Sequence, residues 1–342
     1  MISMRGTFDE YRRELDGMAF SPGEKNELVG RLSHAAAPRR ARLPRAAVAA
    51  GVAIALGAGV VTAYATGALG AAADFLLDVF GEDAAQTQTI ADAVQPAGAS
   101  AAAGGLTVSA DAVLGDDTHY VVVYSLTPDD PTLFEGVARS DEGTVLLDFS
   151  NIAIPENEGA SGGGMGAYFY DADPEDASVQ YVQQCWAQSE GGLAGTSAYV
   201  KFVDLYALDP ETLKPVGEPL ATGTWELEVP LDYESEAIAL PVGQTVDFEG
   251  ASVTVTELSV SPLGVLVSYD LAGTPDASQE FPQLNLPVFV SFADGTSFDA
   301  TWAGGFGDDA HVTKGASFDR IVDTDDIVSV TVGDVTVEVP HA

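Results

Sequence analysis

The sequence is poor in the side chains that most often carry chemistry. Its 342 residues include one cysteine, Cys185, and four histidines. A single cysteine excludes an internal disulfide. Residues 1–45 contain one histidine and no cysteine, so a His/Cys zinc site is excluded there. Cys185 lies beside Trp186 in a strand-like run, which favours a buried, unreactive thiol over a reactive or intermolecular one.

Catalytic motifs are missing as well. The chain has no Gly-x-Ser-x-Gly, no His-Glu-x-x-His, no Ser/His/Asp grouping and no glycine-rich loop that enters a helix. Two carboxylates can hydrolyse a glycoside, but nothing in the sequence marks a pair with a raised pKa. We therefore predict that the protein is not an enzyme and has no catalytic residue and no cofactor.

Positive charge is scarce and unevenly placed. Residues 1–45 hold nine of the 14 Lys+Arg against six acids, whereas residues 74–342 hold five bases and 46 acids. The net charges of these two parts are therefore about +3 and −41. So acidic a surface maintains solubility and repels nucleic acid, which we exclude as a partner. A membrane between the two parts would explain the difference.

Residues 46–73 separate the two parts, and these 28 residues carry no charge. A helix needs about 20 apolar residues to cross a bilayer. Four arginines precede the stretch at positions 39, 40, 42 and 45. The positive-inside rule then predicts a single-pass protein of the cell membrane, with a cytoplasmic N-terminus and extracellular C-terminal domains. A cleaved signal peptide and a buried soluble helix are the alternatives, although 45 residues are too many for a signal peptide's basic region.

Small residues recur every fourth position in this stretch, from Gly51 to Ala71. Such a stripe lets two membrane helices approach closely and would allow a homodimer through the helix. A segment this rich in alanine and glycine also produces the stripe by composition alone.

The first 45 residues predict a short α-helical arm. Phe8, Tyr11 and Leu15 lie on one helical face. Ser21-Pro22-Gly23-Glu24 is typical of a helix start, and Leu28 and Leu32 continue an apolar face after it. The predicted partner-binding residues are Phe8, Tyr11, Leu15, Leu28 and Leu32. Because the arm is too small to fold alone, three uses stay open: folding on a cytoplasmic partner, a loosely ordered tail, or contact with anionic lipid.

Residues 74–342 predict a stalk followed by a mostly β region. Residues 74–103 are rich in Ala, Gln, Thr and Gly and favour a linker. From residue 104 the apolar residues alternate, and the series that opens at 105–126 has a parallel at 250–271. We predict two tandem β-sandwich domains, 104–236 and 237–342, with a single large barrel as the alternative. The glycine-rich run 159–166 is interpreted as a flexible loop.

Two acidic clusters and three tryptophans complete the candidates. Residues 171–176 and 323–326 carry carboxylates of the kind that Ca²⁺ prefers, but neither run fits an EF-hand loop. With 52 acids in the chain such clusters arise by chance, so we predict no metal site. Trp186, Trp225 and Trp302 are expected to anchor the sandwich cores.

Three short motifs carry a resemblance to a known family. They are Gly105-Leu106-Thr107-Val108, the arm segment Tyr11-Arg12-Arg13-Glu14-Leu15, and Ser259-Val260-Ser261-Pro262-Leu263-Gly264. Together with the order of arm, membrane helix and β region, they resemble the domain of unknown function 4179 family.

The resemblance implies an anti-sigma-factor-like bacterial protein with exported immunoglobulin-like domains. Its arm would hold a sigma factor at the membrane while the exported domains sense an extracellular ligand that the sequence does not identify. Some proteins of this layout cleave themselves at Asn-Pro, which this chain lacks. The alternative function is a membrane-tethered extracellular binding or structural module with no cytoplasmic partner.

Overall fold

The computed structural model describes residues 94–140, 144–152, 155–157, 159–171, 176–273, 285–301, 303–308 and 310–341. The predicted arm, with all five partner-binding residues, and the predicted membrane segment 46–73 lie outside these ranges. In the described part of the chain, no helix has the length and hydrophobicity that a membrane crossing requires.

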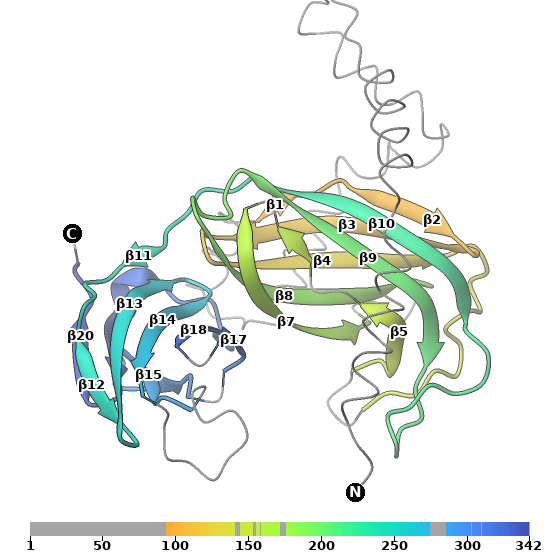
Figure 1. The fold of residues 1–342 in the computed structure, drawn as a ribbon. Helices are drawn as coiled ribbons and strands as arrows, with labels where there is room; N and C mark the ends of the chain where they lie inside the picture. The colour runs from red at the N-terminus through yellow and green to blue at the C-terminus, as the bar shows by residue number, and fades with distance from the viewer. Residues whose placement is uncertain are drawn as a thin grey trace, which may run out of the picture. The chain divides into compact units, whose positions relative to one another are not determined.

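The described chain is mostly β, as the alternating pattern predicted, and it forms four antiparallel sheets (Figure 1). The first sheet has the order β1 (Gln95–Pro96), β3 (Leu106–Gly115), β4 (His119–Pro128), β8 (Val179–Ser189), β7 (Ala160–Tyr170), with β2 (Ser100–Ala103) also paired to β3. The second has the order β10 (Ala221–Leu231), β9 (Thr196–Ala207), β5 (Leu147–Ile152), with β6 (Glu156–Asn157) also paired to β9. We call this pair of sheets the first sandwich.

The other two sheets form the second sandwich. The third sheet has the order β11 (Ile238–Ala239), β13 (Ala251–Ser261), β14 (Gly264–Ala272), β18 (His311–Ser317), β17 (Gly305–Gly307), with β12 (Thr245–Phe248) also paired to β13. The fourth has the order β16 (Ser297–Asp299), β15 (Val288–Phe292), β19 (Ile327–Val332), β20 (Val335–Glu338). A short 3₁₀ turn, η3 (Thr324–Asp326), precedes β19.

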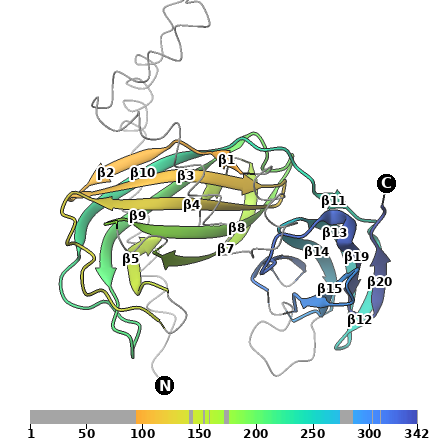
Figure 2. The same ribbon diagram turned by 180° about the vertical axis from the view of Figure 1, so that it is seen from behind.

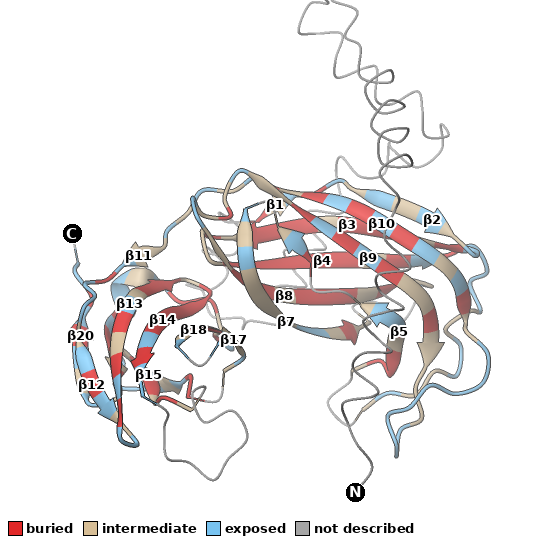
Figure 3. Cartoon of the chain, viewed as in Figure 1, coloured by how far each residue is buried: buried red, intermediate tan, exposed pale blue. Residues whose placement is uncertain are grey.

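Period-two alternation explains how each sandwich forms its core. In β10, Trp225, Leu227 and Val229 are buried, while Glu226 and Glu228 between them are exposed (Figure 3). Side chains alternate across a strand, so one face of the strand packs on the facing sheet and the other meets solvent. The buried residues of the first and second sheets form one hydrophobic cluster, and those of the third and fourth sheets form another.

Aromatic rings fill the centre of the first core. Phe149 of the second sheet stacks on Phe202, with ring centroids 4.7 Å apart, and meets Tyr181 of the first sheet edge-on at 5.7 Å. Trp225 is fully buried, and its indole Nε1 donates to the carbonyl oxygen of Leu106 at 2.9 Å. Because the indole N–H has an acceptor, burial leaves no unpaired donor on Trp225.

The third sheet repeats the topology of the first. In the first sheet, β1 and β2 both pair with β3, and the order continues β3, β4, β8, β7. In the third sheet, β11 and β12 both pair with β13, and the order continues β13, β14, β18, β17. The hairpins even share a bulge, between Ala110 and Ala112 in β3 and between Val255 and Glu257 in β13. The parallel seen in the sequence between 105–126 and 250–271 therefore corresponds to one repeated structural unit.

Two segments differ from the sequence-based prediction. The run 159–166 was predicted to be a flexible loop, but most of it lies in β7 (Figure 2). Its glycines leave room for a tryptophan, because a Cβ on Gly164 would lie 2.5 Å from Trp186 Nε1. Residues 95–96 and 100–103, assigned to the stalk, form β1 and β2 and pair with β3.

Candidate functional site

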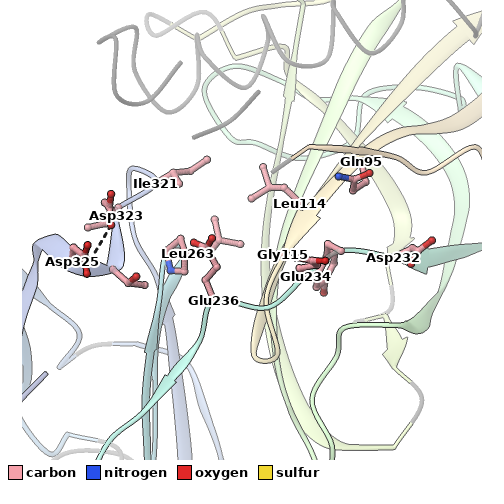
Figure 4. A pocket seen from close by; sticks show the side chains of 14 residues that line it. Gln95, Leu114, Gly115, Asp232, Glu234, Glu236, Leu263, Ile321, Asp323 and Asp325 are labelled. Atoms are coloured by element: carbon pink, nitrogen blue, oxygen red, sulfur yellow. Dashed lines mark hydrogen bonds between the residues drawn. The ribbon is translucent and has the colours of Figure 1, made fainter. Parts of the chain in front are cut away.

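A cleft of about 990 Å³ lies among four segments that are far apart in the sequence (Figure 4). They are the β1–β3 region of the first sheet, the connection 232–237 between β10 and β11, the turn between β13 and β14, and the segment before β19. The lining residues are Gln95, Leu114, Gly115, Asp232, Tyr233, Glu234, Glu236, Pro262, Leu263, Ile321, Val322, Asp323, Thr324 and Asp325.

The cleft combines an apolar floor with an acidic rim. Leu114, Leu263 and Ile321 belong to one buried cluster that joins the outward face of the first sheet to the second sandwich. Five of the lining residues are Asp or Glu and none is Lys or Arg. An acidic cleft of this kind attracts cations and disfavours anions. Sequence analysis missed it because no single segment of the chain contains it.

Tyr233 packs tightly against the wall of the cleft. A Cβ on Gly115 would lie 2.4 Å from Tyr233 Cζ, so only glycine allows this approach. Burial raises the pKa of Tyr233 far above its ordinary value, and the carboxylates of Asp116 and Asp117 act in the same direction. The phenol therefore stays protonated near neutral pH. Its Oη has no hydrogen-bond partner among the described residues.

The turn between β3 and β4 connects the cleft to the second sandwich. Asp116 Oδ1 accepts hydrogen bonds from the backbone N–H groups of Thr118 and His119, at 2.7 and 2.9 Å. The N–H of Asp117 donates to Ser235 Oγ at 3.1 Å. His119 is buried, and a Cβ on Gly264 would lie 2.5 Å from its Nε2. Burial lowers the pKa of His119, and the Asp116 carboxylate acts in the opposite direction.

The outward faces of β8 and β18 carry the other contacts between the sandwiches. Gln188 Nε2 donates to Glu257 Oε2 at 2.5 Å and to Ser268 Oγ at 3.1 Å. Thr313 Oγ1 donates to Gln188 Oε1 at 3.1 Å. Trp186 stacks on Phe306 of β17, with centroids 5.9 Å apart and planes 14° apart.

These positions correct part of the prediction for the tryptophans. Trp225 anchors a sandwich core as predicted. Trp186 does not, because it lies on the outward face of its sheet, against the second sandwich. Trp302 lies outside the described residues.

The acidic clusters make local hydrogen bonds. Asp323 caps η3 by accepting from the N–H of Asp325 at 2.9 Å. Asp171 pairs with Arg139, and residues 172–175 lie outside the described ranges. Across the described residues, no three His, Cys, Asp or Glu side chains are grouped so as to hold a metal ion. Cys185 is buried in the first core, and burial raises its pKa to about 12, which keeps the thiol protonated.

Comparisons with known proteins add little to this geometry. No family model matches the chain, and no curated protein matches it. A solved structure titled "The crystal structure of the conserved domain protein from Bacillus anthracis" is similar over 69% of this chain and 75% of that chain. It is 12% identical, with a TM-score of 0.45.

Proposed function

We propose that the protein is a single-pass, membrane-anchored regulator of the anti-sigma-factor-like type. One observation carries the proposal: an uncharged stretch of 28 residues separates an N-terminal part of charge about +3 from a remainder of about −41. The positive-inside rule gives such a chain a cytoplasmic arm and an exported acidic part. The resemblance to the domain of unknown function 4179 family supplies the regulatory role.

The arm would bind its partner through apolar side chains. Phe8, Tyr11 and Leu15 on one predicted helix, with Leu28 and Leu32 on the next, would enter a groove of a sigma factor. The arm would fold as it binds, because a piece of this size buries too little apolar surface alone.

The sandwiches would form the exported sensor. Their four antiparallel sheets support the coarser part of this proposal, a β-sandwich region after residue 94. The finer part, that each sandwich is immunoglobulin-like and faces the outside of the cell, belongs to the proposal.

The test uses the full-length protein, inserted in bacterial membranes and captured through a C-terminal tag. We expect the wild type to bring down a sigma factor and the Leu28→Asp/Leu32→Asp variant to lose it. The matched control, Asn26→Asp/Ser33→Asp, adds the same charge on the opposite face of the predicted helix and should retain the sigma factor.

Two results would count against the regulator. If the wild type inserts correctly and captures no sigma factor, the chain is a membrane-tethered extracellular module instead. If the control variant loses the sigma factor as fully as Leu28→Asp/Leu32→Asp, added negative charge rather than the apolar face explains the loss.

A further inference from the structure

Strand β7 forms an edge of the first sheet and carries neither the charges nor the proline that commonly protect an edge. Among the described strands it pairs only with β8. Its eleven residues include no charged residue and no proline. Natural edge strands carry charges or proline because an unprotected edge pairs with other chains. The equally long edge strand β10 has this protection, with Glu226, Glu228 and Pro230.

The backbone of β7 presents hydrogen-bonding groups on the side away from β8. The carbonyl oxygen of Phe169 accepts from the N–H of Val145 at 3.0 Å, so the polar groups of Phe169 point to that side. Backbone groups alternate in direction along a strand. Met165 and Ala167 therefore direct their N–H and C=O groups the same way as Phe169.

A groove of about 570 Å³ lies beside the first half of β7. Its lining includes Glu156 and Asn157 of β6, residues 160–163 of β7 and Phe306 of β17. Asn157 Oδ1 accepts from Tyr120 Oη at 3.2 Å. Its Nδ2 is shielded from solvent and has no hydrogen-bond partner among the described residues. Asn157, which lines the groove, thus keeps one buried donor without a partner among the described residues.

We propose that β7 binds an extended, basic peptide segment of a partner protein by strand addition. The peptide backbone would pair with Met165 and Ala167. Because side chains alternate along a strand, every second side chain of the peptide would face the groove.

Charge selects a basic peptide. Residues 74–342 carry 46 acids and five bases, and the groove lining contains Glu156 but no Lys or Arg. An acidic peptide would be repelled and a basic one attracted. A second copy of this chain brings the same excess of negative charge, which disfavours it as the occupant. The ligand of the proposed sensor would then be a basic peptide. Its binding at β7 does not require a cytoplasmic partner.

The experiment uses the full-length protein in detergent and a synthetic probe, an eight-residue peptide of alternating Lys and Val. Binding is measured by calorimetry, and hydrogen exchange is followed at Met165 and Ala167, whose amides should exchange more slowly when the peptide is bound. A Lys–Val peptide with N-methyl groups on alternate residues keeps the charge but loses ladder hydrogen bonds. We expect it to bind about fivefold to 150-fold more weakly, since two such bonds are worth about 1–3 kcal/mol.

Protein variants test the same edge from the other side. Ala167→Pro removes an outward N–H and leaves the β8 ladder intact, so it should weaken binding about tenfold. Ala167→Ser keeps the N–H and should bind like the wild type. If Ala167→Pro fails to fold, as judged by circular dichroism, the N-methylated peptide still decides the question.

Three results would overturn the inference. Equal binding of the N-methylated and unmodified peptides would exclude strand addition. Equal binding of a Glu–Val peptide would exclude selection by charge. A dimer in solution that Ala167→Pro converts to a monomer would assign the edge to a second copy of the chain. Sigma-factor capture through the arm is measured separately, so it can fail while this inference holds.

Discussion

Two buried polar side chains occupy the same place in the two sandwiches. Gln183 on β8 lies opposite Val122 of β4, and Lys314 on β18 lies opposite Val267 of β14. Gln183 Oε1 accepts from Tyr124 Oη at 3.1 Å. Lys314 Nζ donates to the carbonyl oxygens of Leu286 and Thr301 at 3.2 and 2.6 Å. These bonds offset part of the cost of burying each group.

Lys314 should make stability depend on pH. Burial lowers its pKa from the ordinary 10.5 to about 8, with Asp299 acting in the opposite direction. Below pH 8 the amine is protonated in both states, so its stability contribution is constant. Above pH 8 the folded state binds fewer protons than the unfolded state, so stability rises until the unfolded pKa is reached, by up to about 1.4 kcal/mol per pH unit.

Denaturant unfolding at about pH 7.5 and pH 9.5 tests this prediction. Because the buried Cys185 thiol lowers stability over the same range in both proteins, we expect the stability of the wild type relative to Lys314→Met to rise by about 1–2 kcal/mol between the two values. The same pH dependence in both proteins would assign the effect to another group.

The sequence predicted the burial of some residues correctly and of others incorrectly, for a physical reason. The alternation in β10 was enough to place Trp225 in a core, because a buried strand face follows from the pattern alone. Trp186 was also expected in a core, whereas it lies against the second sandwich. A strand pattern does not reveal which outward faces another part of the chain covers. Lys314 was missed because a lone lysine is normally exposed.

At the scale of elements, the hairpin turns show what the repeat requires. Gly104 and Gly105 connect β2 to β3 with positive φ values of 56° and 78°. Glu249 and Gly250 connect β12 to β13 with 50° and 84°. Two successive residues with positive φ form the turn that best matches the twist of a two-residue hairpin. Glycine at the second position of both turns therefore follows from geometry.

Alanine at these glycines should destabilise the fold. A Cβ on Gly105 or Gly250 meets no atom within 4 Å, so the cost comes from the left-handed backbone alone. We expect Gly105→Ala and Gly250→Ala each to lower the free energy of unfolding by about 1–2 kcal/mol. Gly166→Ala is the control, because that site is equally open and has no positive φ. An equal loss in Gly166→Ala would contradict the conformational explanation.

The sequence predicted the repeated hairpin, but it did not predict that the glycine run 159–166 lies mostly in a strand. Alternation, a turn and a second valine-rich strand recur in both series, which is a local pattern. Three consecutive glycines predict flexibility by the same local rules. In β7 the rings of Phe306 from β17 and Trp186 from β8 lie where side chains on Gly162 and Gly164 would be, and the β8 backbone lies there at Gly163. Only the tertiary fold supplies that information.

At the scale of the whole molecule, the acidic cleft and the β8–β18 contacts lie on the same outward face of the first sheet. Leu114 lies in the floor of the cleft. Gln188 makes the polar contact, and it lies on β8 towards the opposite end of the strand from Val182. A ligand in the cleft would therefore touch both sandwiches. The sequence predicted two β-sandwiches in tandem but gave no sign of this shared face, because its residues come from distant segments.

Trp186 should hold these contacts together without supporting the first core. A Cβ on Gly315 would lie 2.2 Å from Trp186 Cδ2, so the indole rests directly on the β18 backbone. Trp186→Ala removes that contact and leaves a cavity, at a cost of about 3–5 kcal/mol for a buried tryptophan. Hydrogen exchange should then accelerate at Gly315 and Phe306, while the amide of Trp225 in the first core stays protected. The control is Trp186→Phe, which keeps a ring over Gly315 and should show a smaller change. Equal acceleration at Trp225 in Trp186→Ala would contradict this prediction, because the indole would then also stabilise the first core.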